Sequence, residues 1–242
     1  MKRVTRPAYT GEMNQLVHSK KSKSAAAEVA KEVGRTNDPA RTMAEILAVA
    51  THEFADKGLT GARIDEIAAA TRTSKRMIYY YFGSKDGLYL AVLEEAYRRM
   101  RAIEADLHLG DLAPVAALRK LVEFTYDHHR DNEDFIRLVM NENIQRGDYL
   151  RQSKNIQALN SNAIASVQEI YARGVSQGVF RPGLDPVDIH SAISAFTFFN
   201  VSNRHTFGVI FQNEASQGKA KTLKRAHVVE LILRFVGYAV SA

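Results

Sequence analysis

The sequence contains no cysteine, and this absence excludes several kinds of site. A disulfide framework, a thiolate metal site and a cysteine nucleophile all require a residue that the chain does not have. A reducing compartment suits such a composition, so we expect a cytoplasmic protein.

Long apolar runs are also missing. The segment from Met1 to Thr10 contains no apolar stretch of the kind that a secretory signal needs. The most apolar tract, residues 228–240, is interrupted by Glu230 and Arg234, and it is shorter than the ~20 apolar residues that cross a bilayer. We therefore expect a soluble protein with no membrane partner.

The sequence shows none of the common enzyme motifs. It has no nucleophile elbow, no glycine loop for phosphate and no His-Glu-x-x-His spacing. Residues 127–131 include His128 and His129, but adjacent residues on a helix cannot both face one metal ion. We interpret this segment as a solvated helix end and expect no metal, no cofactor and no enzyme. An all-α enzyme that uses these groups is a distant alternative.

The charge of the chain is modestly basic. Its 242 residues carry a formal net charge of +6. Such an excess suits a polyanion such as nucleic acid, but it is also common in proteins that bind neither DNA nor membranes. Residues 1–37 are polar and basic, and we interpret them as a flexible arm, either a solvated tail or an accessory DNA contact.

From residue 38 onward the apolar residues follow a helical period, without sets of β-branched residues in strand alternation. Asp38 with Pro39 begins the first helix, Gly58 closes it, and Ser74 and Ser84 cap later helices. The pattern predicts helices at about residues 39–58, 63–70, 74–80, 85–107, 114–130, 133–145, 150–176, 186–203 and 222–240. The predicted fold class is all-α, with an N-terminal three-helix helix-turn-helix DNA-binding domain over residues 38–85. A C-terminal helical bundle for ligand binding and dimerisation is expected over residues 86–242.

The second and third helices are joined by a short turn. A turn of this length permits only a sharply angled pair, which is typical of a helix-turn-helix unit. The last helix of such a unit lies in the major groove, and its outward side chains contact bases and phosphates. The outward candidates are Thr73, Ser74, Lys75, Arg76, Tyr79 and Tyr80. Because consecutive helical residues are ~100° apart, at least one of residues 79–81 should pack inward with Phe82.

Residues 54–58 read FADKG, and residues 67–88 read IAAATRTSKRMIYYYFGSKDGL. From about residue 41 to residue 100 the chain resembles the DNA-binding domain of the tetracycline-repressor (TetR) family, with many positions agreeing in register. The resemblance implies that Lys75, Arg76 and Tyr79 contact base edges or nearby phosphates. It also implies that Tyr80, Tyr81 and Lys85 contact the DNA backbone.

Three positions depart from the family pattern. Arg63 follows Ala62 where a Ser or Thr usually opens the second helix, so the side-chain cap is missing and Arg63 becomes a candidate phosphate contact. Arg72 stands where glycine is usual and should adopt a positive φ at some energetic cost. Arg76 replaces a small residue and is an added candidate for reading guanine.

Two segments of the C-terminal half, residues 189–201 and 228–240, are apolar on more than one side. A helix of this kind must be covered on two sides. One side can pack on its own chain, while the other needs a second subunit. We expect a homodimer through the helices at about residues 186–203 and 222–240, matched to a palindromic operator.

A ligand pocket is expected among the middle helices, with apolar walls and a few polar anchors. Candidate walls are Phe124, Phe135, Val139, Met140, Ile164, Val167, Tyr171, Phe196 and Phe199. Candidate anchors are His128, Asn143, Asn200, Asn203, Arg204 and His205. Plain core packing or a capping role is the alternative for each of them. The anchors slightly favour an amphipathic or acidic aromatic effector.

These observations together predict a one-component DNA-binding transcription regulator. The favoured form is a repressor that a small molecule releases from its operator by tilting the helix that starts at Lys85. The alternative is a constitutive or architectural DNA-binding protein without an effector, whose affinity follows salt with little sequence preference.

Overall fold

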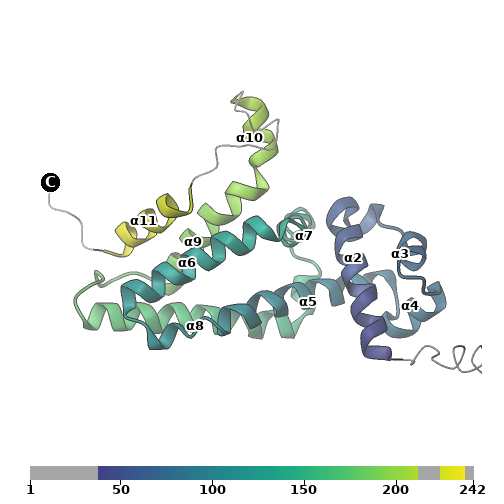
Figure 1. Ribbon diagram of the computed structural model, residues 1–242, viewed down its shortest axis with the longest axis horizontal. Coiled ribbons are helices and arrows are strands. Elements are labelled where there is room, and N and C mark those ends of the chain that lie inside the picture. The colour runs from purple at the N-terminus through teal and green to yellow at the C-terminus, as the bar shows by residue number, and fades with distance from the viewer. Residues whose placement is uncertain (1–37, 212–223, 238–242) are drawn as a thin grey trace, which may run out of the picture. The chain divides into compact units, whose positions relative to one another are not determined.

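The computed structural model describes residues 38–211 and 224–237, and this part of the chain is all-α, without a β-strand (Figure 1). Its elements are α2 (Pro39–Gly61), α3 (Ile64–Ala70), α4 (Lys75–Phe82), α5 (Lys85–Ala105), η1 (Leu109–Asp111), α6 (Pro114–Asp131), α7 (Glu133–Ile144), η2 (Leu150–Gln152), α8 (Lys154–Ser176), α9 (Pro186–Ser202), α10 (Arg204–Ile210) and α11 (Arg225–Val236). The predicted fold class is confirmed. The predicted arm at residues 1–37 and both ends of the last predicted helix lie outside the described residues.

Residues 43–242 form one unit, and residues 1–42 form another. Of the smaller unit the structure describes only the beginning of α2, where Asp38 Oδ1 accepts a hydrogen bond from Arg41 N at 3.1 Å. This bond supports the predicted helix start at residues 38 and 39.

Side-chain caps begin the helices on which the DNA-binding region depends. Ser74 Oγ accepts from Met77 N at 3.3 Å, and Ser84 Oγ accepts from Gly87 N at 2.9 Å. Both caps satisfy amide groups that have no partner in the first turn of a helix. The two predicted starts are therefore confirmed.

The predicted end of the first helix is a kink inside α2. Gly58 has φ 66° and ψ 175°, which is not helical, and the chain then makes one more short turn to Gly61. A glycine adopts this backbone at little cost. The carbonyl groups before the kink then need partners other than the next turn of the helix.

The helices of the DNA-binding region pack around a hydrophobic cluster, which we call the head core. Its buried members are Ile46, Ala50, Phe54, Ala55, Ala62, Ile64, Ile67, Ala68, Ile78, Leu88, Tyr89, Val92, Leu93, Leu138 and Ile156. Phe54 and Tyr89 meet edge to face, with ring centroids 5.1 Å apart. Leu138 comes from α7 and Ile156 from α8, so two helices of the C-terminal half complete this core.

In the C-terminal half, α6 packs against α8, α9 and α11, as Figure 1 shows. The approach of α8 to the turn that follows it requires a glycine. A Cβ atom at Gly174 would lie 1.9 Å from Phe180 Cδ2, too close for any other residue without movement. Phe180 is buried in the cluster that α6, α8, α9 and α11 share.

Four features differ from the expectations. The sequence does not predict the short helix α10, and the helix expected from residue 150 is instead η2 followed by α8. The interpretation of residues 127–131 as a solvated helix end is wrong for the two histidines, since His128 and His129 are buried. Helix α11 is mostly covered by its own chain, and among its described apolar side chains of residues 228–236 only Leu231 is exposed.

Arg72 has φ 51°, which confirms the predicted positive φ in the turn between α3 and α4. The left-handed region costs a non-glycine residue about 1 kcal/mol. We therefore expect Arg72→Gly to have a free energy of unfolding about 0.5–1 kcal/mol above that of Arg72→Ala, after allowing for the flexibility of glycine in the unfolded chain. Urea denaturation measures this difference. Alanine is the matched control because both variants lack the arginine side chain, and equal stabilities would contradict the strain.

Candidate DNA-reading helix and ligand cavity

Helix α4 is joined to α3 by a tight turn of four residues, 71–74. Thr73 N donates to Ala68 O at 3.0 Å and closes this turn. Arg63, just before α3, has extended backbone and no side-chain cap, as predicted. Its own backbone N donates to Glu53 Oε1 at 3.1 Å, so a carboxylate of α2 holds the residue at which α3 begins.

The two sides of α4 differ sharply. Ile78 is fully buried in the head core, and Tyr81 and Phe82 are half-buried against it. Tyr79 and Tyr80 are 43% and 78% exposed. The tyrosine triplet is thus divided as helical geometry requires, with two phenols outward and one inward beside Phe82.

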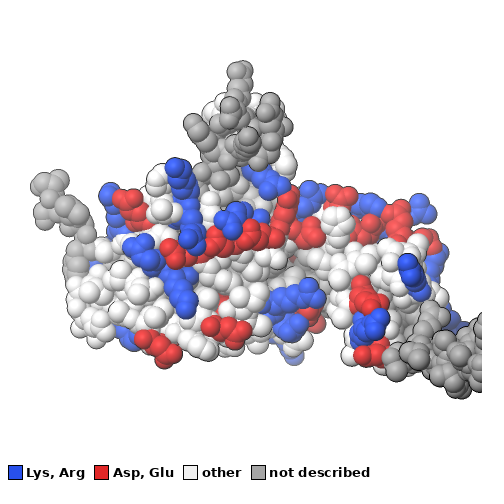
Figure 2. Space-filling view, viewed as in Figure 1, with Lys and Arg blue, Asp and Glu red and all other residues white. Residues whose placement is uncertain are grey.

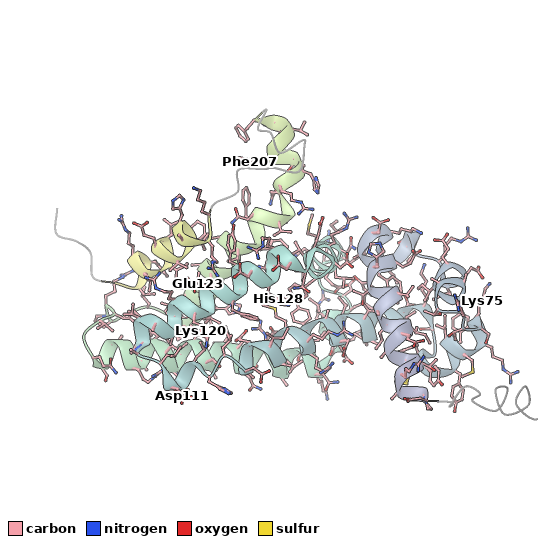
Figure 3. All side chains as sticks on the ribbon, in the orientation of Figure 1. Lys75, Asp111, Lys120, Glu123, His128 and Phe207 are labelled. Carbon is pink, nitrogen blue, oxygen red and sulfur yellow. The ribbon has the colours of Figure 1, made fainter. Side chains whose placement is uncertain are left out.

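Cationic side chains flank the exposed phenols. Arg76 is exposed, and Lys75, labelled in Figure 3, is exposed while forming an ion pair with Asp65 of α3. Lys85 Nζ, at the start of α5, donates to Thr60 O at 3.3 Å. On the face seen in Figure 2, basic and acidic side chains are interspersed. On this face there is no continuous basic surface, and what α4 offers to a polyanion is a local group of cations.

A cavity of about 430 Å³ lies among α5, α6, α7, α8 and α9. Its walls include the rings of Tyr97, Phe135 and Phe198. Its lining residues are Tyr97, Met100, Arg101, Glu104, Leu121, Thr125, His129, Phe135, Val139, Asn143, Asn160, Val167, His190, Ser191, Ile193, Ser194, Ala195 and Phe198. The volume falls within the range of small-molecule sites.

Charged and titratable side chains gather in this mostly apolar cavity. Arg101 pairs with Glu104 one turn later on α5, and its Nη2 donates to Asn160 Oδ1 of α8 at 3.1 Å. Burial lowers the pKa of His129 to about 3, helped by the nearby charges of His128, Arg101 and His190. Burial also raises the pKa of Glu104, although Arg101 opposes this shift.

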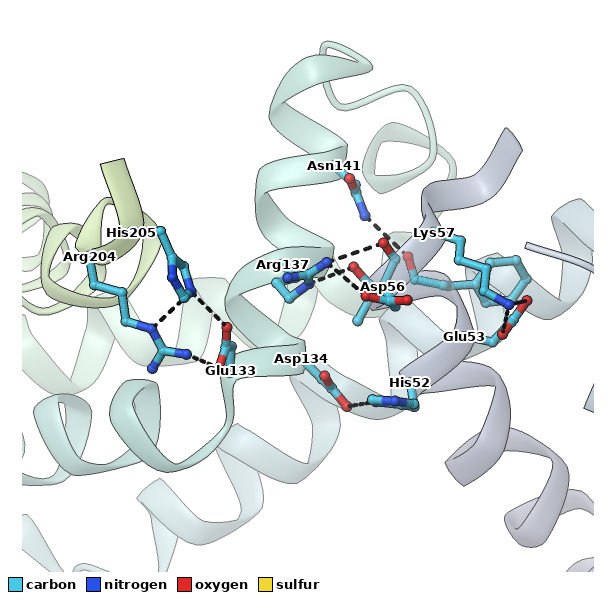
Figure 4. A network of polar contacts seen from close by, with 12 residues as sticks. His52, Glu53, Asp56, Lys57, Glu133, Asp134, Arg137, Asn141, Arg204 and His205 are labelled. Carbon is cyan, nitrogen blue, oxygen red and sulfur yellow. Dashed lines mark hydrogen bonds and ion pairs between the residues drawn. The ribbon is translucent and has the colours of Figure 1, made fainter. Parts of the chain in front are cut away.

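Helix α7 contacts both the cavity and α2, as Figure 4 shows in part. Arg137 Nε donates to Ala55 O at 2.9 Å, and its Nη2 donates to Asp56 O and Asp56 Oδ1, each at 3.1 Å. Asn141 Nδ2 donates to Phe54 O at 3.2 Å. These donors satisfy carbonyl groups just before the kink at Gly58.

Known proteins match both halves of the chain. Residues 46–92 match the bacterial regulatory proteins of the tetR family, and residues 114–232 match the tetracyclin repressor-like C-terminal domain. The HTH-type transcriptional repressor NicS of Pseudomonas putida is 34% identical over 200 residues, which cover 83% of this chain and 94% of NicS. This chain belongs to the TetR family. It is a DNA-binding transcription regulator of that family.

Solved structures of TetR-like regulators share the fold. The Streptomyces coelicolor protein SCO4942 is 27% identical, with a TM-score of 0.60 over 81% of this chain and 98% of that protein. AibR, solved in complex with isovaleryl coenzyme A and operator DNA, is 18% identical, with a TM-score of 0.57 over 81% of this chain and 98% of its own. An identity as low as that of AibR shows likeness of fold alone.

For this TetR-family chain, the structure divides the predicted ligand residues. Phe135, Val139, Asn143 and Val167 line the cavity. The remaining candidates do not line it: Phe124, His128, Met140, Ile164, Tyr171, Phe196, Phe199, Asn200, Asn203, Arg204 and His205. Among them, Tyr171 Oη donates to Arg181 O at 2.8 Å, and Arg204 pairs with Glu133.

The sequence does not predict the charged and titratable residues of the cavity. His129 was passed over for its neighbour His128, and nothing in the sequence decides which of two adjacent histidines faces the interior. Arg101 follows Arg98 and Arg99, which both pair with Glu95 near the surface. The spacing of Arg101 and Glu104, an ion pair at i and i+3, was the available signal.

Two further findings concern the described ranges alone. No helix in residues 38–211 or 224–237 combines the length and apolar character needed to span a membrane. Within the same ranges, no group of three or more His, Asp or Glu side chains is placed to hold a metal ion.

The buried His129 should make stability depend on pH. Its folded-state pKa is lowered, so its full contribution is present above about pH 6.5 and declines as the pH falls toward 3. Between pH 7 and pH 5, the free energy of unfolding should fall by about 2 kcal/mol more in the native chain than in His129→Gln. Urea denaturation at both pH values measures this. The exposed His227→Gln should behave like the native chain, and parallel curves for native chain and His129→Gln would contradict the burial argument.

Proposed function

We propose that this TetR-family regulator is a dimeric repressor that binds a palindromic operator through α4 and releases it when a small organic molecule occupies the cavity. The observation that carries the proposal is the division of α4 into a side fixed in the head core and a side of exposed cations and phenols. NicS, which is similar over most of its length, is named as a transcriptional repressor. AibR shares the fold and was solved with both an organic ligand and operator DNA.

In the proposed complex α4 enters the major groove. Arg76 reads a guanine edge, since a guanidinium can donate two hydrogen bonds to the two acceptors there. Tyr79 and Tyr80 donate to bases or phosphates with little rotamer entropy to lose, and Lys75 leaves Asp65 for a phosphate. Lys85 and the N-terminus of α5 hold a further phosphate.

The proposed dimer uses mainly α9. Phe196 and Phe199 on this helix are 37% and 49% exposed, although rings of this size are usually buried. Nearer the start of α9, Ile189 and Ile193 are buried within the same chain. Helix α11 adds Leu231, which is 40% exposed. A second copy that brings the same residues covers both sets by symmetry.

Release of the operator follows from two helices that contact both sites. Helix α5 begins at Lys85 and lines the cavity with Tyr97 and Arg101. Helix α7 lines the cavity with Phe135 and places Leu138 in the head core. A ligand that moves either helix therefore moves α4, and affinity falls to the extent that the ligand prefers the moved state.

The DNA-reading role predicts an uneven effect of removing positive charge. Arg76→Ala should weaken binding to a duplex selected from a random pool by about ten-fold or more at fixed salt, because it removes base contacts. Arg119→Ala removes an equal charge from an exposed position on α6 and should change affinity less than about two-fold. Fluorescence anisotropy measures both affinities. Equal losses for the two variants, with little preference for the selected duplex, would favour an architectural DNA-binding protein instead.

The dimer predicts a second effect. Phe196→Glu with Phe199→Glu places two carboxylates in the proposed interface and should convert the dimer to a monomer, with loss of operator affinity because one half-site is then bound alone. Size-exclusion chromatography with light scattering measures the mass. Val179→Glu changes an apolar residue that is 40% exposed in the turn between α8 and α9, and it should remain a dimer. A double variant that stays dimeric excludes this interface.

A further inference from the structure

The cavity contains polar atoms that the described chain leaves without partners. Arg101 has one donor, Nε, that is buried without a hydrogen bond, and the side chain is 11% exposed. His129 is 4% exposed, lines the cavity, and its Nδ1 also has no partner among the described residues. A buried donor without a partner costs free energy, so such atoms point to a ligand that completes them.

The donors come from three helices and lie close enough to influence one another. Arg101 of α5 disfavours the protonation of His129 on α6 and of His190 on α9, and His190 adds to the effect on His129. All three side chains line the same cavity. Because their elements are far apart in sequence, only the folded bundle brings this cationic group and two imidazoles together.

The lining favours an anionic ligand over a cationic one. Its one carboxylate, Glu104, is already paired with Arg101. The amide groups also have internal bonds: Asn160 Nδ2 donates to Ile156 O, and Asn143 Nδ2 donates to Val139 O, each at 2.9 Å. The groups left to bind are the Nε of Arg101, the two imidazoles, which can each donate one hydrogen bond when neutral, and the hydroxyl groups of Tyr97, Ser191 and Ser194.

Aromatic rings form much of the apolar part of the cavity lining. Tyr97 and Phe135 meet edge to face at 5.3 Å, and His129 is stacked on Phe135 with centroids 6.0 Å apart. Phe198 meets His129 edge to face at 6.3 Å. Rings arranged in this way suit a planar apolar body.

We propose that the cavity binds a small planar organic acid, with its carboxylate on Arg101 between His129 and His190 and its apolar body against Tyr97, Phe135 and Phe198. The inference rests on the proposed function, because it names the class of effector for the same cavity. The carboxylate accepts a hydrogen bond from Arg101 Nε and shares the guanidinium with Glu104.

Binding of an anion also changes the protonation of the cavity. Burial and Arg101 hold the pKa of His190 below its usual range, and an adjacent carboxylate raises it again. The other groups that face this site are Tyr97, Glu104 and His129, together with Arg101, while α7 and α8 contribute amides and apolar side chains. An acid should therefore be bound with uptake of protons, and its affinity should rise as the pH falls.

The experiment compares acids with their neutral amides on the full chain without DNA. The probes are benzoate and benzamide, phenylacetate and phenylacetamide, and 2-naphthoate and 2-naphthamide, with benzylamine as the cationic probe, all measured by isothermal titration calorimetry at pH 7. At least one acid should bind about ten- to hundred-fold more tightly than its amide, as expected for a charge-assisted hydrogen bond. Titrations in two buffers of different ionisation enthalpy should show proton uptake for that acid and none for its amide.

Variants assign the preference to Arg101. Arg101→Met combined with Glu104→Met removes both charges, leaves no unpaired carboxylate behind and should abolish the preference for the acid. Arg98→Met changes an exposed arginine of the same helix and should keep it. If circular dichroism shows that the double variant does not fold, the acid preference of Arg101→Lys and the proton uptake of the native chain test the proposal instead.

Three results would overturn the proposal: amides or benzylamine bind as tightly as the acids, none of the three acids binds, or the preference survives in the double variant. Operator binding is measured separately by anisotropy. Loss of the acid preference with operator binding intact removes the ligand class and leaves the repressor, whereas absence of operator binding removes the proposed function and leaves the cavity chemistry standing.

Discussion

The DNA-binding helices and the C-terminal bundle of this TetR-family chain share a hydrophobic core, and the rest of the structure depends on this. Leu138 and Ile156, from α7 and α8, are buried among side chains of the first helices. A close-packed interior leaves no empty space along such a boundary. The DNA-binding helices therefore cannot shift unless the side chains of the C-terminal bundle repack, and the reverse also holds. The donors of Arg137 and Asn141 add polar contacts to the same boundary, at the carbonyls before the kink in α2. Two rigid helices, α5 and α7, thus connect the cavity with the helices around α4, without a long chain of intermediate contacts.

The fold was predictable where its signals are local. Ser74 and Ser84 begin helices because a hydroxyl within one turn of a free amide is enough to do so, and Arg72 takes a positive φ because the turn leaves no other path. The errors occur where tertiary contacts decide. Helix α10 follows Ser202 after a single residue, without the Gly or Pro that would announce a new helix. The burial of His128 and His129 depends on α6 being covered from several sides, which no periodicity of α6 reveals.

The α4 surface and the cavity also differ in how well the sequence predicts them. The α4 surface could be predicted because it consists of consecutive residues in one motif, with Ile78 inward and Tyr79 and Tyr80 outward. The cavity could not, because its lining comes from five helices and a rotation of ~100° decides whether His128 or His129 faces it. Composition gave the right kind of walls and some members, Phe135 and Val167 among them. The buried charges were hidden within a sequence of arginines whose other members lie at the surface.

Without DNA, two of the cations near α4 are already occupied. Lys75 is held by Asp65, and Lys85 is bonded to the carbonyl of Thr60. Any duplex must displace these internal partners before it gains the phosphate contacts, so attraction to arbitrary sequence is reduced, while a site that also satisfies Arg76 keeps its base contacts in full. A genome presents a regulator with an enormous excess of competing sites. Internal neutralisation of this kind lowers the affinity for target and background alike, and the weaker background binding shortens the time that a searching regulator spends on the wrong stretch of chromosome.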